Sequence, residues 1–179
     1  MGMPAYFLIL AIYIQQGRGL NALEAGLVVT AAGIGYLVAS LAAAPLTARF
    51  GRQVIAAGGL TRAGGLAALF LLVAHDRPIG WLVPALLVDG VGMGLALAPI
   101  MGTVLARVAP HHAGAAAGAL TTMQQVGGAI GVGIVGIVFY GSLASGITPA
   151  FQHGLLYLIA IALALAGLVQ LLPRTPANA

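Results

Sequence analysis

The stretch Pro45-Leu46-Thr47-Ala48-Arg49-Phe50-Gly51-Arg52 places two arginines in a short turn between two long apolar runs. Upstream, residues 25–47 carry no charged side chain. A helix of that length crosses a hydrocarbon core of about 30 Å. Because the chain enters a second apolar run directly after the turn, the arginines mark one side of a bilayer. The pattern predicts a chain that crosses a membrane.

Composition supports the same interpretation. Of the 179 residues, 61% are hydrophobic and 6% are charged, whereas about 25% of the residues in soluble domains are charged. The seven arginines are spread singly between apolar runs, while a nucleic-acid-binding protein gathers its basic residues on one face. The chain has no cysteine, which excludes a disulfide framework and a thiolate metal site.

Neither a cofactor nor a metal is expected, and the chain is not expected to be an enzyme. His111, His112 and His153 lack the spacing and the acidic partners of a metal site. The glycines at 90, 92 and 94 lie in a continuous apolar run rather than after a strand, so they do not form a dinucleotide-binding loop.

Six predominantly apolar runs predict six transmembrane helices within one domain of residues 1–173. These runs are 3–16, 24–47, 54–74, 79–104, 113–143 and 149–172. The side that carries Arg49, Arg52, Arg107 and Arg174 is expected to be cytoplasmic, because only Arg18 and Arg77 fall on the other side. The short tail 174–179 would therefore also be cytoplasmic.

The start of the second run shows a further local signal. Asn21 and Glu24 have the spacing of a capping box, which favours a capping role for Glu24 over a substrate-binding role. The first run is only about 14 residues long, or roughly 21 Å as a helix. We therefore expect either the rear part of a longer membrane protein or a chain that starts at an internal methionine.

The first and fourth connections resemble each other. Arg18 precedes Ala25-Gly26, and Arg107 precedes Ala113-Gly114. Inverted three-helix repeats would place such an echo in these two connections. Chance recurrence of alanine and glycine in a chain with 27 glycines explains it as well.

Several motifs, in order, resemble the major facilitator superfamily. The stretch from Pro45 to Arg52 is similar to the loop motif that joins the second and third helices of each six-helix half. The remaining motifs resemble the rear half of the fourteen-span drug:proton antiporter branch; they are Tyr13-Ile14-Gln15, residues 19–27, Gly90-Val91-Gly92-Met93-Gly94 with Pro99, Ala113-Gly114, and residues 124–131. Together they cover nearly the whole chain.

The resemblance implies an all-α membrane protein that forms one half of a major facilitator fold, a 3+3 inverted repeat. It also implies proton-coupled efflux of hydrophobic or amphipathic compounds, including drugs, across a bacterial cell membrane. The front half and its antiporter motif are absent from this sequence. The expected partners are therefore membrane lipid, a proton, a small hydrophobic substrate, and either the N-terminal half of the same transporter or a second copy.

Asp89 is the first candidate for proton coupling. It lies 11 residues beyond Pro78, roughly 16 Å into the bilayer, and Arg62 lies at a similar depth on the preceding helix. A lone carboxylate there costs about 2.5–3.5 kcal/mol on insertion scales. Asp89 therefore either exchanges a proton during transport or pairs with Arg62 and only fixes the packing. Arg62 is an intramembrane ion-pair candidate, although its stem could also snorkel toward the cytoplasmic interface.

Other polar residues are weaker candidates for the cavity. Gln124 and Gln125 reach the depth of Asp89 and could bind a solute or hydrogen-bond between helices. Tyr36 lies in the middle of the second run. Tyr13, Gln15 and Gln16 lie near the outer end of the first run, where interfacial anchoring competes with cavity lining.

The remaining predictions concern packing and gating. Small-residue spacing predicts close helix approach at three pairs of glycines, which are Gly90 with Gly94, Gly114 with Gly118, and Gly127 with Gly131. Arg49 and Arg52 are expected to hold a cytoplasmic gate loop that begins at Pro45, with Gly51 permitting the turn.

Three hypotheses follow for the function. The chain is the rear half of a proton-coupled export carrier, a non-transporting six-helix membrane protein that is a remnant or an assembly partner, or a half-size carrier that acts as a homodimer.

Overall fold

The computed structural model describes residues 3–105 and 108–170, in which every regular element is a helix. Arg107 and residues 171–179 with Arg174, which the sequence placed on the cytoplasmic side, lie outside the described residues. The six main helices are α1 (Met3–Ile12), α2 (Ala22–Phe50), α3 (Gln53–Ala74), α4 (Leu82–Leu105), α5 (Ala113–Gly141) and α6 (Ile147–Gln170).

Five segments of the described residues are long and apolar enough to cross a membrane, and they correspond to the helices α2 to α6. α1 has ten α-helical residues and continues as a π-helical turn, Tyr13–Gly17. Short 3₁₀ turns, Ile79–Trp81, Pro110–His112 and Leu143–Ser145, precede α4, α5 and α6. The predicted all-helical membrane fold is confirmed.

The start of α2 follows from the capping box expected at Asn21 and Glu24. The Asn21 side chain accepts a hydrogen bond from the Glu24 N–H at 2.9 Å, and the Asn21 N–H donates to the Glu24 carboxylate at 3.0 Å. These two bonds satisfy amides that a helix start otherwise leaves without partners. The capping role of Glu24 is confirmed.

The connection between α2 and α3 is shorter than the sequence suggested, so its predicted extent is wrong. Pro45 and Arg49 lie inside α2, and only Gly51 and Arg52 separate the two helices. Gly51 has φ +56° and donates its N–H to the Thr47 carbonyl, so the chain turns there. Pro45 has no N–H to donate to the Leu41 carbonyl, but proline is tolerated inside membrane helices.

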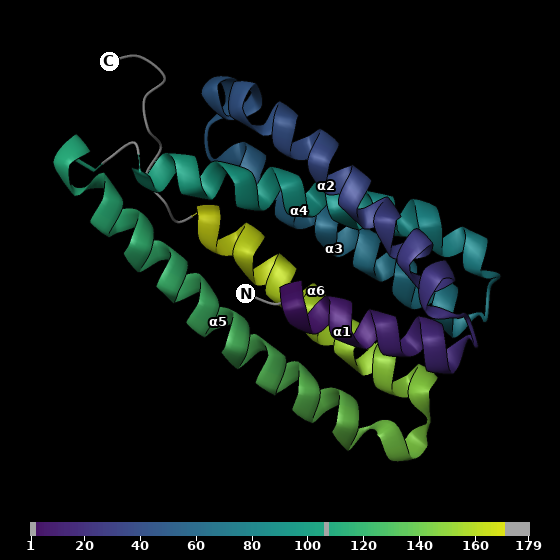
Figure 1. Ribbon diagram of the computed structural model, residues 1–179. Helices are drawn as coiled ribbons and strands as arrows, with labels where there is room; N and C mark the ends of the chain where they lie inside the picture. Colours follow the sequence, from purple (N-terminus) through teal and green to yellow (C-terminus); the bar gives the residue numbers. More distant parts are fainter. Residues whose placement is uncertain (1–2, 106–107, 171–179) are drawn as a thin grey trace.

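The helices form the contact pattern of two three-helix repeats. α2 packs on α4, α1 packs on α5, and α3 packs on α6. If α1, α2 and α3 are exchanged with α4, α5 and α6 in order, the first two pairs replace each other and the third maps onto itself. Because each repeat has an odd number of crossings, the second repeat runs inverted relative to the first. α3 also packs extensively on α4, a contact whose counterpart between α6 and α1 is slight. In Figure 1, α2, α4 and α3 lie along one side of the bundle, and α5 runs along the opposite side.

The α2–α4–α3 layer is tightly packed because glycines remove side chains from its interfaces. A β-carbon on Gly90 would meet the backbone of Ala32, and one on Gly94 would stand 2.6 Å from the Tyr36 carbonyl oxygen. Both glycines therefore let α4 approach α2 closely.

The other two glycine pairs lie on α5. Gly127 and Gly131 are buried there. Gly114 and Gly118 would have nothing within 4 Å of an added β-carbon, so the close approach expected at this pair is not present in the described chain.

Candidate functional site

Asp89 is completely buried in the middle of α4, with 0% of its surface exposed. α3 runs directly against it, because a β-carbon on Gly65 would stand 2.6 Å from the backbone nitrogen of Asp89. Because Gly65 has no side chain, the α3 backbone lies in contact with Asp89. Among the described residues, neither oxygen of Asp89 has a hydrogen-bond partner.

Arg62 on α3 provides the positive charge nearest to this carboxylate. Its Nε lies 3.5 Å from Oδ1 of Asp89, and its side chain is 13% exposed. At this distance the two side chains form an ion pair, but the atoms are too far apart for a good hydrogen bond. The Arg62 backbone is adjacent to Gly92 on α4, where a β-carbon would stand 2.7 Å from the Arg62 Cβ. The two helices thus pack around the pair through glycines.

Tyr6 on α1 completes a buried polar cluster with Arg62 and Asp89. Its side chain is fully buried, and its hydroxyl interacts electrostatically with both charged groups. Within the described residues, the hydroxyl makes no hydrogen bond. The cluster therefore joins α1, α3 and α4 through three polar groups that are close together but not closed by hydrogen bonds.

Sequence reasoning missed Tyr6. The residue lies in the apolar run Met3-Pro4-Ala5-Tyr6-Phe7-Leu8, where it resembles an aromatic core residue. The available signal was the hydroxyl itself, since a phenolic O–H at membrane depth requires a polar neighbour.

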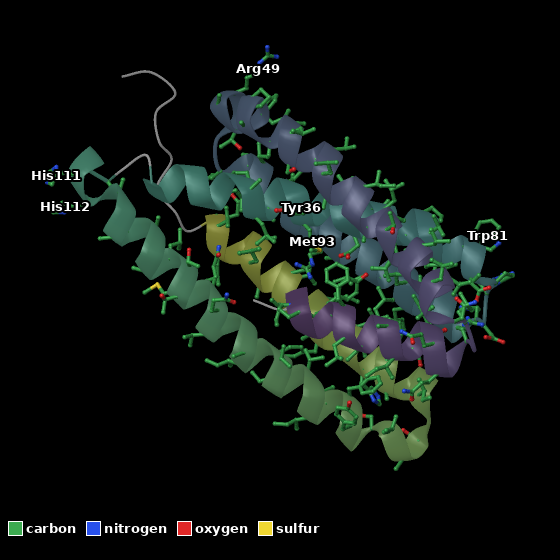
Figure 2. The ribbon with its side chains drawn as sticks, in the orientation of Figure 1. Tyr36, Arg49, Trp81, Met93, His111 and His112 are labelled. Atoms are coloured by element: carbon green, nitrogen blue, oxygen red, sulfur yellow. The ribbon has the colours of Figure 1, made fainter. Side chains whose placement is uncertain are left out.

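The other cavity candidates are not gathered around Asp89. Gln124 and Gln125 are exposed on α5, which packs mainly on α1 and α6, and Gln15 is exposed in the π-helical turn. Tyr36 is half-buried on α2, and Figure 2 shows it in the middle of the bundle near Met93. Of the predicted site residues, the structure brings Arg62 and Asp89 together.

A second set of polar contacts lies at the Trp81 end of the bundle, opposite the end that carries Arg49, His111 and His112 (Figure 2). Arg18 donates to the Tyr13 hydroxyl at 2.7 Å and to the Arg77 carbonyl at 3.0 Å, and it pairs with Asp76 at 2.5 Å. The Tyr13 ring stacks on Phe151 of α6. These contacts tie the connection after α1 to the α3–α4 connection and to α6.

The Arg49 end contains the predicted gate residues. Arg49 is exposed in the last turn of α2, and Arg52 is half-buried at the start of α3. Nearby, the side chains of Gln53 on α3 and Gln170 on α6 form a hydrogen bond of 3.3 Å.

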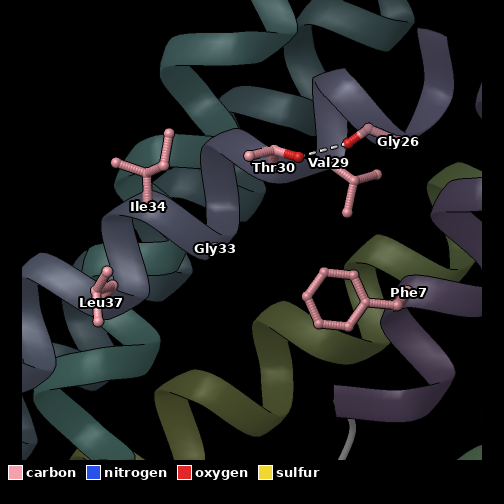
Figure 3. A pocket seen from close by; sticks show the side chains of 7 residues that line it. All are labelled: Phe7, Gly26, Val29, Thr30, Gly33, Ile34 and Leu37. Carbon is pink, nitrogen blue, oxygen red and sulfur yellow. Dashed lines mark hydrogen bonds between the residues drawn. The ribbon is translucent and has the colours of Figure 1, made fainter. Parts of the chain in front are cut away.

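An apolar groove of about 380 Å³ lies between α1 and α2. Figure 3 shows the Phe7 ring of α1 facing α2 across this groove. On α2, Gly26 and Gly33 leave space where side chains would stand, because nothing lies within 4 Å of a β-carbon added to either. The Thr30 hydroxyl donates a hydrogen bond to the Gly26 carbonyl at 2.8 Å, so the polar side chain in the lining already has a partner within α2. Val29, Ile34 and Leu37 complete the lining.

Comparison with known proteins identifies the family. The Major Facilitator Superfamily model matches residues 1–179. The chain is 36% identical to the puromycin resistance protein pur8 of Streptomyces alboniger, over 94% of this chain and 36% of that protein. It is 33% identical to the cephamycin export protein CmcT of Amycolatopsis lactamdurans, over 97% of this chain and 37% of that protein.

A third relative, a probable actinorhodin transporter of Streptomyces coelicolor, is 35% identical over 86% of this chain and 27% of its own length. The chain thus spans about a third of the length of these relatives. The family match over the full sequence, the identities and the apolar helices agree with one another. The chain is a multi-pass membrane protein that belongs to the Major Facilitator Superfamily.

Proposed function

We propose that this chain forms the rear, six-helix half of a proton-coupled carrier that exports hydrophobic or amphipathic compounds from a bacterial cell. The names of its relatives, which include resistance and export proteins, support the class of substrate and the direction. Because the chain matches only about a third of each relative, the N-terminal half of the same transporter is the proposed partner.

The observation that supports proton coupling best is the environment of the Asp89 carboxyl group. Its carboxyl group is fully buried, has no hydrogen bond among the described residues, and lies 3.5 Å from the Arg62 guanidinium. The charged form gains from the attraction of Arg62, while the neutral form avoids the cost of placing an anion away from water. Because neither form is fixed by hydrogen bonds, a small helix movement can favour one over the other. This balance suits a group that takes up and releases a proton.

The remaining roles in the carrier follow from position. The α1–α2 groove and the exposed Gln124 and Gln125 are proposed to contact the exported compound, with Tyr36 at the cavity wall. Arg49 and Arg52 are proposed to hold the cytoplasmic gate. This assignment places the Arg49 end in the cytoplasm and the Trp81 end outside.

The experiment compares Asp89→Asn with Asp76→Asn in everted membrane vesicles that contain the full carrier. Both variants replace a carboxylate by an amide, but Asp76 is 89% exposed. Accumulation of a compound to which the carrier confers resistance is measured with and without an imposed pH gradient. We expect Asp89→Asn to abolish the effect of the gradient, since the amide cannot exchange a proton. Asp76→Asn should change it by no more than about twofold, because an exposed ion pair contributes little.

Gradient-driven accumulation that survives unchanged in Asp89→Asn would leave Asp89 with a packing role and remove it from coupling. Equal losses of gradient-driven accumulation in Asp89→Asn and Asp76→Asn would also contradict the proposal, because the buried carboxylate would then matter no more than the exposed one.

A further inference from the structure

Two consecutive residues of α1 face two different features of the molecule. Tyr6 is buried against Arg62 and Asp89, whereas the neighbouring Phe7 is half-buried and lines the groove next to α2. Their ring centroids are 5.2 Å apart. Successive side chains on a helix point about 100° apart, so one short helix reaches both the buried polar cluster and the groove. Figure 3 shows Phe7 at the groove. Any shift of α1 moves both side chains together.

α1 is held less tightly than the layer it touches. Its backbone packs on α5 and α6, and it reaches α3 and α4 through longer side chains of the shared apolar core. α4, in contrast, is locked between α2 and α3 by glycine contacts at Gly65, Gly90 and Gly92. α1 also passes into a π-helical turn after Ile12, and such turns interrupt the regular backbone bonding of a helix. A displacement of α1 is therefore easier than one of α4.

The Tyr6 hydroxyl can bond Asp89 in both of its protonation states. It donates a hydrogen bond to a carboxylate and accepts one from a carboxylic acid, whereas Arg62 can only donate hydrogen bonds. Among the described residues, Tyr6 and Arg62 are the titratable or charged side chains that act on Asp89. On its other side, α4 packs against Ala32 and Gly35 of α2, which carry no charge.

We propose that Tyr6 is a positioning residue through which the protonation state of Asp89 sets the position of α1, and with it the width of the groove between Phe7 and α2. When Asp89 is charged, Arg62 and Tyr6 both donate to it. When Asp89 is neutral, Tyr6 can accept a hydrogen bond from it and Arg62 cannot, so the hydroxyl and α1 adopt a different position. This inference rests on the proposed role of Asp89 as the proton site.

The absence of cysteine from this sequence allows a direct measurement of the distance between α1 and α2. Cysteines replacing the exposed Leu8 on α1 and Leu41 on α2 carry nitroxide labels in the full carrier, with cysteines elsewhere removed. Pulsed electron spin resonance then gives the distribution of distances between the two labels. It is measured without any transported compound, between about pH 5 and pH 9, because buried acids commonly have pKa values raised into this range.

Four proteins are compared, each with this pair of labels. The otherwise unchanged carrier should show a distance distribution that changes with pH, and Asp89→Asn should show one distribution at every pH. Tyr6→Phe should lose at least half of the pH-dependent change. The matched control Tyr140→Phe removes the same hydroxyl from an exposed position on α5 and should behave as the unchanged carrier.

The outcomes separate this inference from the proposed function. If Asp89→Asn is fixed while Tyr6→Phe changes exactly as the unchanged carrier does, Asp89 remains the proton site and the role of Tyr6 is wrong. If Asp89→Asn still changes with pH, the proton site itself is wrong. If no protein changes with pH, α1 does not respond to Asp89 and the inference fails. Tyr6→Phe should fold normally, because it keeps the buried ring and removes only the hydroxyl oxygen.

Discussion

At the scale of single residues, the sequence identified two members of the buried polar cluster and missed the third. Asp89 and Arg62 were recognisable because a charge in the middle of an apolar run is costly and requires an explanation. Their depths, counted from the ends of neighbouring runs, placed them at one level. Tyr6 escaped because an aromatic ring fits an apolar helix, and because its contact with Asp89 depends on how α1 packs on α3 and α4. Packing between distant helices has no local sequence signal.

Arg62→Gln tests the electrostatic balance of the cluster. The change leaves a carboxylate buried without a counter-charge and should lower the free energy of unfolding of the full carrier by about 3 kcal/mol at neutral pH. The loss should shrink as the pH falls, because a protonated Asp89 carries no charge that needs Arg62. Thermal unfolding in mild detergent at neutral and acidic pH measures both values.

Arg77→Gln is the matched control, since it removes the same charge from an exposed position. It should change the free energy of unfolding by no more than about 0.5 kcal/mol. A loss in Arg62→Gln that is equally large at both pH values would show that the guanidinium acts through packing rather than through charge.

At the scale of helices, a capping signal predicted a helix start well, while helix ends were harder to predict. The capping box at Asn21 fixed the beginning of α2 within the first turn. The expected run 24–47 includes Pro45 but ends three residues before α2 does, at Phe50. Proline marks a helix end in water more dependably than in a membrane, where the lack of water keeps the backbone helical. Gly51, which adopts positive φ, was the better marker.

Glycine substitutions test which helix contacts are close. Gly90→Ala places a methyl group against the Ala32 backbone, so α4 and α2 must separate, and we expect a loss of about 1–3 kcal/mol in the free energy of unfolding. Gly133→Ala on α5 has open space at the same atom and should be neutral or slightly stabilising, by up to about 1 kcal/mol, since alanine favours the helix. Thermal unfolding of the two variants side by side makes the comparison. Similar losses in both would contradict the close packing of α2 on α4.

At the scale of the whole molecule, the apolar runs and the order of motifs were enough to predict a six-helix half of a major facilitator fold. The likeness between the first and fourth connections did not distinguish a repeat from chance, whereas three of the helix pairs have the pattern of an inverted repeat. The sequence could not predict that α5 packs on α1 and α6 rather than closely on α4, with Gln124 and Gln125 exposed. Depth along a helix gives the level of a residue but not the direction in which it points.

The arrangement in the membrane is tested by labelling single cysteines. Leu23 lies beside the connection after α1, Phe50 lies beside Arg49, and both side chains are exposed. In intact cells that express the full carrier, a membrane-impermeant maleimide should modify Leu23→Cys. Phe50→Cys should react only after the membrane is opened, because the arginine-rich connection is expected inside. The reverse pattern would invert the proposed direction of every helix.

The exchange of a proton at Asp89 is tested most directly by infrared difference spectroscopy of the full carrier between acidic and alkaline pH. A protonated carboxylic acid has a carbonyl stretching band that a carboxylate lacks. We expect one such band from a buried acid to appear on acidification, to be absent from Asp89→Asn, and to persist in Asp76→Asn. A spectrum in which Asp89→Asn retains the same band, or in which no buried acid titrates, would contradict the assignment of Asp89 as the proton-carrying group.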